Sequence, residues 1–269
     1  MAAYLTRCLK ETFVAFEEPQ VRPVLPGVAG QIERRLRRRF LETHELLGRG
    51  AVLRAFERGD DAVLRRFAYE RHVWWEQQMR RRGATHYVDI SKHFLHGLHV
   101  HALDFVDMDL RAIRLVRDPV LNMRSYTNRE KKLALDYSPP DAPSNELCWD
   151  PTGWSRGEFY LHAWAETYLR GARYVAEHGL SEPIDLATDQ LSDTAAMATF
   201  LRQLGLPHEV LPAGGPQNTN LQAGYGGTRV GPEDVEAFQR FRDRLTLDQL
   251  RRLPIPDDYD PARLLEFAA

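Results

Sequence analysis

The chain has 269 residues, of which 43% are hydrophobic and 28% are charged, and its formal net charge is −2. This length and composition are typical of a globular protein with a substantial buried core. No apolar run approaches the roughly 20 residues that a membrane span needs. The N-terminal sequence MAAYLTRCLK has no apolar core of a secretory signal. We therefore expect a cytoplasmic protein without a membrane partner.

Periodicity and turn residues predict helices and strands in alternation. In chain order, we expect a helix over 4–10, a short strand within 12–19, helical segments between 30 and 82, strands over 85–91 and 111–116, a helix over 119–135, a loop over 138–154, a helix over 156–179, a strand over 182–187, a helix over 192–205, a loop over 211–230 and a helix over 232–251. This order indicates a three-layer α/β fold, a mainly parallel sheet flanked by helices. We see no linker or repeat, and predict a single domain over residues 1–269.

The chain contains no clear motif for a nucleic acid or a metal. The basic run IERRLRRRF (32–40) places apolar residues at helical spacing, which favours one solvated helix face over a nucleic-acid patch. Cys8 and Cys148 form no CxxC pair, and the four histidines of HFLHGLHVH (93–101) do not share one helix face. We predict no nucleic-acid partner and no bound metal. The oligomeric state stays open, with a homodimer as one option.

The stretch RLVRDPVLNMRSY places an arginine where an apolar strand ends and a helix begins. Arg117 ends the predicted strand, and Ser125 follows eight residues later on the predicted helix. Asp118, Asn122 and Ser125 are spaced so that they share one helix face. A guanidinium and a hydroxyl can hold a phosphate between them, the guanidinium by two parallel hydrogen bonds. The alternative is a solvated basic helix start, which is how we interpret the other arginines of this stretch.

This stretch also resembles the 3′-phosphate-binding segment of sulfotransferases that use 3′-phosphoadenosine 5′-phosphosulfate (PAPS). The segments LTRCLKETFVAFEEP, YVDISKH and IDLATDQLSDTAAMATFLRQLGL resemble other parts of that family in the same order. The resemblance covers most of residues 4–206 and is strongest at 112–126. It implies a P-loop NTPase-like architecture, PAPS as the co-substrate, and transfer of a sulfuryl group to a hydroxyl or amine of a small-molecule or glycan acceptor.

The family's Gly-rich loop for the 5′-phosphosulfate, together with its first strand, would stand just before Tyr4. Only Met1, Ala2 and Ala3 precede Tyr4 in this chain. We therefore expect either a start further upstream or a fold without the first strand and its P-loop. In the second case the alternative function is a non-catalytic, sulfotransferase-like binding protein. A nucleotide kinase ranks last, because the chain has no GxxxxGK[ST] motif.

The resemblance also suggests which residues act in the reaction. His93 follows a predicted strand end and is the candidate base, because imidazole titrates near neutral pH. Lys92, one of only four lysines, is the candidate for stabilising negative charge in the transition state. Glu18, or Glu17 beside it, is the rival base.

Two predicted loops complete the candidate site. GYGGTR (224–229) resembles a later phosphate loop and would supply Arg229 as a cation, although a surface loop is an equal alternative. Loops as long as 138–154 often bind ligands or cover sites. Within that loop Trp149 and Trp154 are the aromatic residues most suited to contact an aromatic acceptor.

Overall fold

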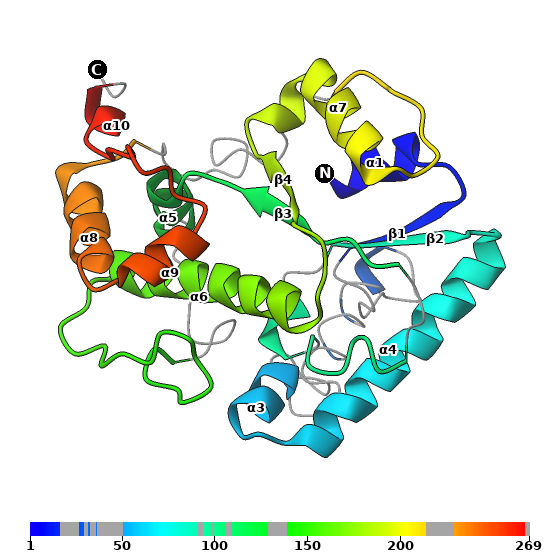
Figure 1. Cartoon of the computed structure of the whole chain (residues 1–269), viewed down its shortest axis with the longest axis horizontal. Coiled ribbons are helices and arrows are strands. Elements are labelled where there is room, and N and C mark those ends of the chain that lie inside the picture. Colours follow the sequence, from blue (N-terminus) through cyan, green and yellow to red (C-terminus); the bar gives the residue numbers. More distant parts are fainter. Residues whose placement is uncertain are drawn as a thin grey trace. The chain divides into compact units, whose positions relative to one another are not determined.

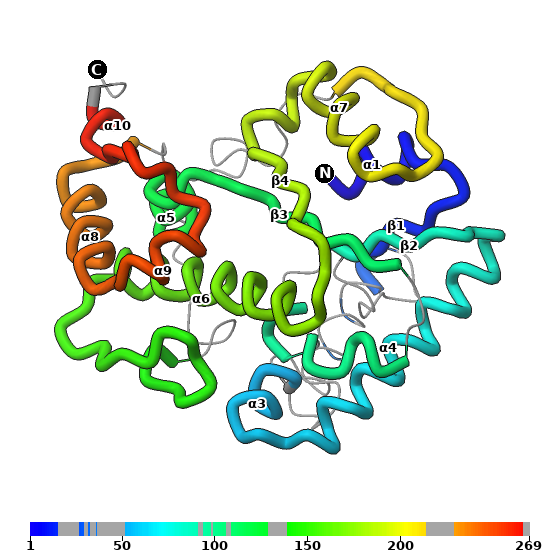
Figure 2. The backbone as a smooth tube through the Cα atoms, viewed as in Figure 1, coloured from blue at the N-terminus to red at the C-terminus, as the bar shows by residue number. Residues whose placement is uncertain are grey.

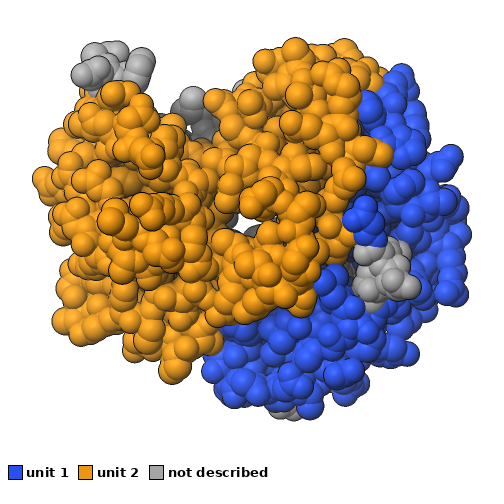
Figure 3. All heavy atoms as spheres, in the orientation of Figure 1, with its two compact units in different colours: residues 1–109, 135–137, 206–209 blue, residues 110–134, 138–205, 210–269 orange. Residues whose placement is uncertain are grey.

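The structure is a computed structural model that describes residues 1–16, 27–29, 32, 36, 51–90, 94–97, 99–105, 109–128, 139–213 and 229–266 (Figures 1 and 2). These residues form a mixed α/β structure, as the sequence predicts. The chain divides into two compact units (Figure 3): unit 1 contains residues 1–109, 135–137 and 206–209, and unit 2 contains residues 110–134, 138–205 and 210–269. The single domain remains a prediction, and the two units are described in turn.

Unit 1 contains two parallel strands. Its elements are α1 (Ala2–Cys8), β1 (Thr12–Phe16), α3 (Ala51–Glu57), α4 (Asp61–Arg82), β2 (His86–Ile90) and the short 3-10 helix η1 (Phe94–His96). β1 and β2 pair in register from Thr12↔His86 to Phe16↔Ile90. The strands predicted within 12–19 and over 85–91 are therefore confirmed, and the helix predicted over 4–10 is present but ends at Cys8.

The long helix α4 has a capping residue at each end. The Asp60 carboxylate accepts a hydrogen bond from the backbone N–H of Val63 at 3.2 Å. Gly83 follows the last turn with φ of 61°, a conformation that glycine adopts without a steric penalty. Between these ends, Trp75 packs in a buried cluster with Phe13 of β1. Capping and burial together explain why this segment is one continuous helix.

Unit 2 contains the second pair of parallel strands. Its elements are β3 (Ile113–Val116), α5 (Pro119–Thr127), α6 (Arg156–Glu177), β4 (Ile184–Ala187), the 3-10 helix η3 (Gln190–Ser192), α7 (Thr194–Leu204), α8 (Pro232–Arg242), α9 (Leu247–Arg252) and α10 (Arg263–Glu266). β3 and β4 pair in register from Ile113↔Ile184 to Val116↔Ala187. Across this pair, Arg114 donates two hydrogen bonds to Asp185, each of 2.7 Å.

The core of unit 2 forms where α5, α6 and α8 pack together. The residues of this core with the least exposed surface include Val120, Met123, Leu161, Phe238 and Phe241. Gly157 in the first turn of α6 makes the close packing possible. A Cβ atom at this position would lie 2.8 Å from Met123 Sδ and 3.3 Å from Ala237 Cβ. α5, whose connection from β3 carries Arg117, is therefore held against two other helices.

Glu158 fastens the start of α6 by several hydrogen bonds. Its Oε2 accepts from the Ser155 N–H at 3.0 Å, and its own N–H donates to the Ser155 Oγ at 3.2 Å, which together form a capping box. Arg244 donates to Oε1 at 2.7 Å, and Arg240 lies 3.5 Å away. Burial alone would raise the pKa of Glu158, but these hydrogen bonds and positive charges outweigh it and lower the pKa to about 2.

Two predicted helices differ in extent from those in the structure. The helix predicted over 119–135 ends at Thr127, and most of its remaining residues lie outside the described part of the chain. The helix predicted over 232–251 is two helices, α8 and α9. The break occurs because Thr246 and Gln249 form a capping box that starts a new helix. The described strands form two separate pairs, whereas the sequence predicts one mainly parallel sheet. Among the described residues, no helix has the length and apolar character to cross a membrane.

Candidate functional site

The connection from β3 to α5 contains Arg117 and Asp118. Asp118 is the N-cap of α5: its Oδ1 accepts a hydrogen bond from the Leu121 N–H at 2.8 Å, and Pro119 occupies the first helical position. The other carboxylate oxygen accepts a hydrogen bond from the Tyr259 hydroxyl at 2.8 Å. Burial, and then the negative charge of Asp118 and this hydrogen bond, raise the pKa of Tyr259 well above its ordinary value. Both oxygens of Asp118 are therefore already engaged.

Arg117 is half-buried and lacks a carboxylate partner among the described residues. Its Nη1 donates one long hydrogen bond, of 3.3 Å, to the Asn122 side-chain oxygen. Two other arginines in or near β3 are engaged differently. Arg114 forms the bidentate pair described above, and the exposed Arg111 donates to the Gln203 carbonyl at 3.3 Å. Because Arg117 is partly removed from water and has a single neutral partner, most of its N–H donors remain available to an anion.

Ser125 lies on α5 but is only 6% exposed. This burial leaves little of the Ser125 side chain accessible to a ligand. Asn122 and Ser125 lie on α5 and Asp118 is its N-cap, and Asn122 accepts the hydrogen bond from Arg117. The contact of Ser125 with a phosphate stays a prediction.

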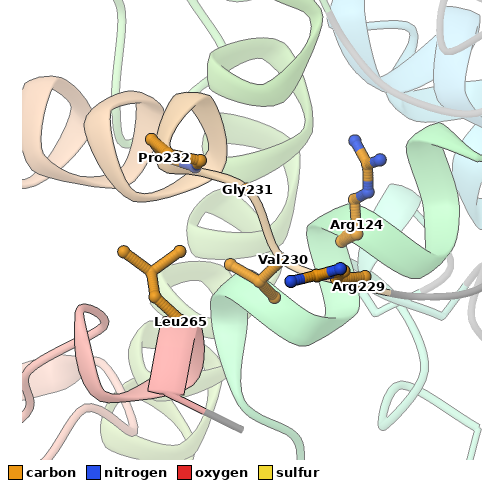
Figure 4. A pocket seen from close by; sticks show the side chains of 6 residues that line it. All are labelled: Arg124, Arg229, Val230, Gly231, Pro232 and Leu265. Atoms are coloured by element: carbon orange, nitrogen blue, oxygen red, sulfur yellow. The ribbon is translucent and has the colours of Figure 1, made fainter. Parts of the chain in front are cut away.

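Arg229 lines a pocket of about 460 Å³ in unit 2 (Figure 4). The pocket is also lined by Arg124 of α5 and by Val230, Gly231, Pro232 and Leu265. In Figure 4 the two arginines lie on one side of the pocket, and Pro232 and Leu265 lie on the other. Arg117 and Ser125 are not among the lining residues, so the structure combines Arg229 with Arg124 and not with the predicted 3′-phosphate residues.

Arg124 is a residue that sequence reasoning assigned to a solvated basic face. Its guanidinium lies 3.7 Å from both Glu233 Oε1 and Asp234 Oδ2, distances too long for hydrogen bonds. Its Nε is buried and has no hydrogen-bond partner. The sequence offered no signal for this position, because Arg229 is more than 100 residues further along the chain.

The three predicted catalytic residues, His93, Lys92 and Glu18, lie outside the described residues, as does Glu17. Their roles stay predictions. Of the neighbouring histidines, the described His101 forms contacts of 2.7 Å to both Asp61 and Asp104. Within the described ranges, no group of three or more His, Cys, Asp or Glu side chains has the arrangement of a metal site.

The loop before α6, whose residues 139–154 are described, is fixed to that helix by buried polar groups. Glu166 accepts hydrogen bonds from the backbone N–H groups of Glu146 at 2.9 Å and Leu147 at 3.0 Å. Arg170 donates to Glu166 at 2.6 Å and to the Asn145 side chain at 2.7 Å. Glu166 and Arg170 are 5% and 2% exposed. This part of the loop therefore has a defined position on α6.

The tryptophans of this loop pack around His162. Trp149 and Trp154 have ring centroids 6.1 Å apart, and both lie within 6 Å of the His162 ring. His162 Nε2 is 2.6 Å from the Leu147 carbonyl oxygen, and burial lowers the pKa of the imidazole. A neutral imidazole that donates to this carbonyl satisfies both observations. The two indoles thus form part of the packing between loop and helix, and their contact with an acceptor stays a prediction.

Comparisons of the chain with protein-family models, with curated proteins and with solved structures found no match.

Proposed function

We propose that the chain is a sulfotransferase that transfers a sulfuryl group from PAPS to a hydroxyl or amine of a small-molecule or glycan acceptor. We further propose that its two parallel strand pairs belong to a three-layer, P-loop NTPase-like architecture. The observation that supports the function best is Arg117, a half-buried guanidinium just after the carboxyl end of a parallel strand, with a single neutral partner among the residues that the structure describes.

The environment of Arg117 suits a phosphate for physical reasons. A partly desolvated arginine attracts a dianion more strongly than an exposed one, and its planar donors match two phosphate oxygens. The N-terminus of α5 adds a favourable partial positive charge at the same place. The described hydrogen bonds of the Asp118 carboxylate come from Leu121 and Tyr259 and not from Arg117. In this proposal Arg117 binds the 3′-phosphate of PAPS.

The proposed reaction is an in-line transfer. The acceptor oxygen or nitrogen forms a bond to sulfur while the bond between sulfur and the bridging phosphate oxygen breaks. The acceptor proton passes to a base, and adenosine 3′,5′-bisphosphate leaves. His93 is proposed as the base with Glu18 as its rival, and Lys92 would stabilise charge on the bridging oxygen. Arg229, expected as a second phosphate cation, lines a pocket that Arg117 does not line, and it has no role in this reaction scheme.

Calorimetric titration with adenosine 3′,5′-bisphosphate tests this proposal. The wild-type chain should bind this product saturably, and absence of binding would refute the proposed function. A second measurement then separates catalysis from binding alone. PAPS is incubated with a mixture of hydroxyl and amine acceptors, and the released adenosine 3′,5′-bisphosphate is quantified. Release above a no-protein control supports the enzyme, whereas tight binding without release supports the non-catalytic alternative.

A further inference from the structure

The pocket that contains Arg124 and Arg229 combines two cationic side chains with an apolar wall. Arg124 is on the last turn of α5, and Arg229 to Gly231 lead into α8, which begins at Pro232. Val230 is buried, and the side chain of Leu265 comes from α10. Three separate segments of unit 2 therefore converge on one cavity of about 460 Å³ (Figure 4).

The two guanidiniums retain donors for a ligand. Neither contact of Arg124 with an acidic side chain is shorter than 3.7 Å, and its Nε is buried without a partner. Arg229 is exposed and forms no ion pair with the described residues. A buried N–H without an acceptor costs free energy, and a ligand oxygen at this position would remove that cost.

The two neighbouring carboxylates do not replace such a ligand. Asp234 accepts a hydrogen bond from the Gly231 N–H at 2.9 Å and is directed to the helix start, where it caps α8. The Glu233 side chain is 67% exposed, so water screens its attraction to Arg124. Both acids reduce the net positive charge of the pocket, but neither lies within hydrogen-bond distance of the Arg124 guanidinium.

We propose that this pocket binds a small organic anion, with a phosphate, sulfate or carboxylate head between Arg124 and Arg229 and an apolar body against Val230, Pro232 and Leu265. The charged head would form charge-assisted hydrogen bonds with the guanidiniums. The apolar body would cover the side chains on the opposite side of the pocket and gain from leaving water. This site is separate from the proposed 3′-phosphate site, because Arg117 does not line it.

The probe for this proposal is phenyl phosphate, titrated into the full chain by calorimetry. Inorganic phosphate lacks the apolar body and benzyl alcohol lacks the charge, so both should bind at least about tenfold more weakly. Arg124→Gln and Arg229→Gln should each weaken phenyl phosphate binding by about tenfold or more, since each removes a charged hydrogen bond. Arg251→Gln, an exposed arginine on α9, is the matched control and should bind as the wild type does.

Each outcome decides the proposal. No saturable binding of phenyl phosphate up to ~10 mM, a concentration at which even millimolar affinity is measurable, would overturn it. Equal binding of inorganic phosphate would overturn the role of the apolar wall. Binding that Arg117→Ala abolishes and Arg229→Gln does not change would place the ligand at the end of β3 instead. Arg229→Gln is the decisive variant, because the exposed Arg229 side chain has no ion pair or hydrogen bond with the described residues; its circular dichroism should match the wild type.

Discussion

Replacing Glu166 by alanine should destabilise unit 2 strongly. The variant removes the carboxylate that accepts hydrogen bonds from Glu146, Leu147 and Arg170. Arg170 is only 2% exposed, so its positive charge would remain buried without its closest anionic partner. Breaking a buried ion pair on one side typically costs about 3–5 kcal/mol. Because the free energy of unfolding of a domain is typically about 5–15 kcal/mol, this loss would be a large fraction of it.

The double variant Glu166→Leu, Arg170→Met separates the ion pair from the rest of the network. It removes both charges, so the penalty for an unpaired buried charge disappears and the double variant should be more stable than Glu166→Leu alone. We expect it to stay below wild-type stability, because the N–H groups of Glu146 and Leu147 still lack acceptors. Glu177→Ala is the control: Glu177 is 61% exposed on the same helix, and its loss should cost less than about 0.5 kcal/mol.

Urea unfolding followed by tryptophan fluorescence measures the free energy of unfolding of each variant. Native-state hydrogen exchange at the amides of Glu146 and Leu147 reports the same network locally, and Glu166→Ala should make both amides exchange faster. A loss below about 1 kcal/mol, together with unchanged exchange at these amides, would show that the loop is held by other contacts.

Two predictions concern pH. The pKa of Glu158 is lowered to about 2 from 4.5, so its contribution to stability is present above pH 4.5 and is lost as the pH falls toward 2. Glu158→Gln should remove that part of the acid dependence, about 3 kcal/mol in urea titrations across this range, and an unchanged acid profile would contradict the assignment. The pKa of Tyr259 is raised, so its contribution is present below pH 10 and is lost as the pH rises further. Tyr259→Phe should cost about 1 kcal/mol at pH 8 and give a flatter alkaline profile, whereas a parallel profile would show that Tyr259 does not titrate in this way.

Local signals in the sequence predict much of the secondary structure, because caps and periodicity act over a few residues. Asp118 followed by Pro119 predicts the start of α5, and Gly205 ends α7 with a φ of 68°. The break between α8 and α9 was also present as a local signal in Thr246 and Gln249, but the continuous apolar periodicity concealed it. The pairing of strands depends on contacts between distant segments, and periodicity alone carries no information about them.

The candidate site shows the same division. The position of Arg117 between a strand and a helix could be predicted, because a strand end followed by a helix start is a local pattern. The hydrogen bond from Tyr259 to the neighbouring Asp118 could not be predicted, since the two residues are 141 positions apart in the chain. The position of Arg124 beside Arg229 was also not predictable, because both residues line one pocket only through the packing of α5 against α8.

The central claim is that Arg117 binds the 3′-phosphate of the nucleotide, and a cycle of two ligands and two proteins tests it most directly. Calorimetry would measure adenosine 3′,5′-bisphosphate and adenosine 5′-monophosphate with the wild type and with Arg117→Ala, using Arg111→Ala as the control. The wild type should prefer the bisphosphate by about tenfold or more, as expected for a charged hydrogen-bonded pair. Arg117→Ala should abolish this preference, and Arg111→Ala should keep it. A preference that survives in Arg117→Ala, or no preference in the wild type, would contradict the claim.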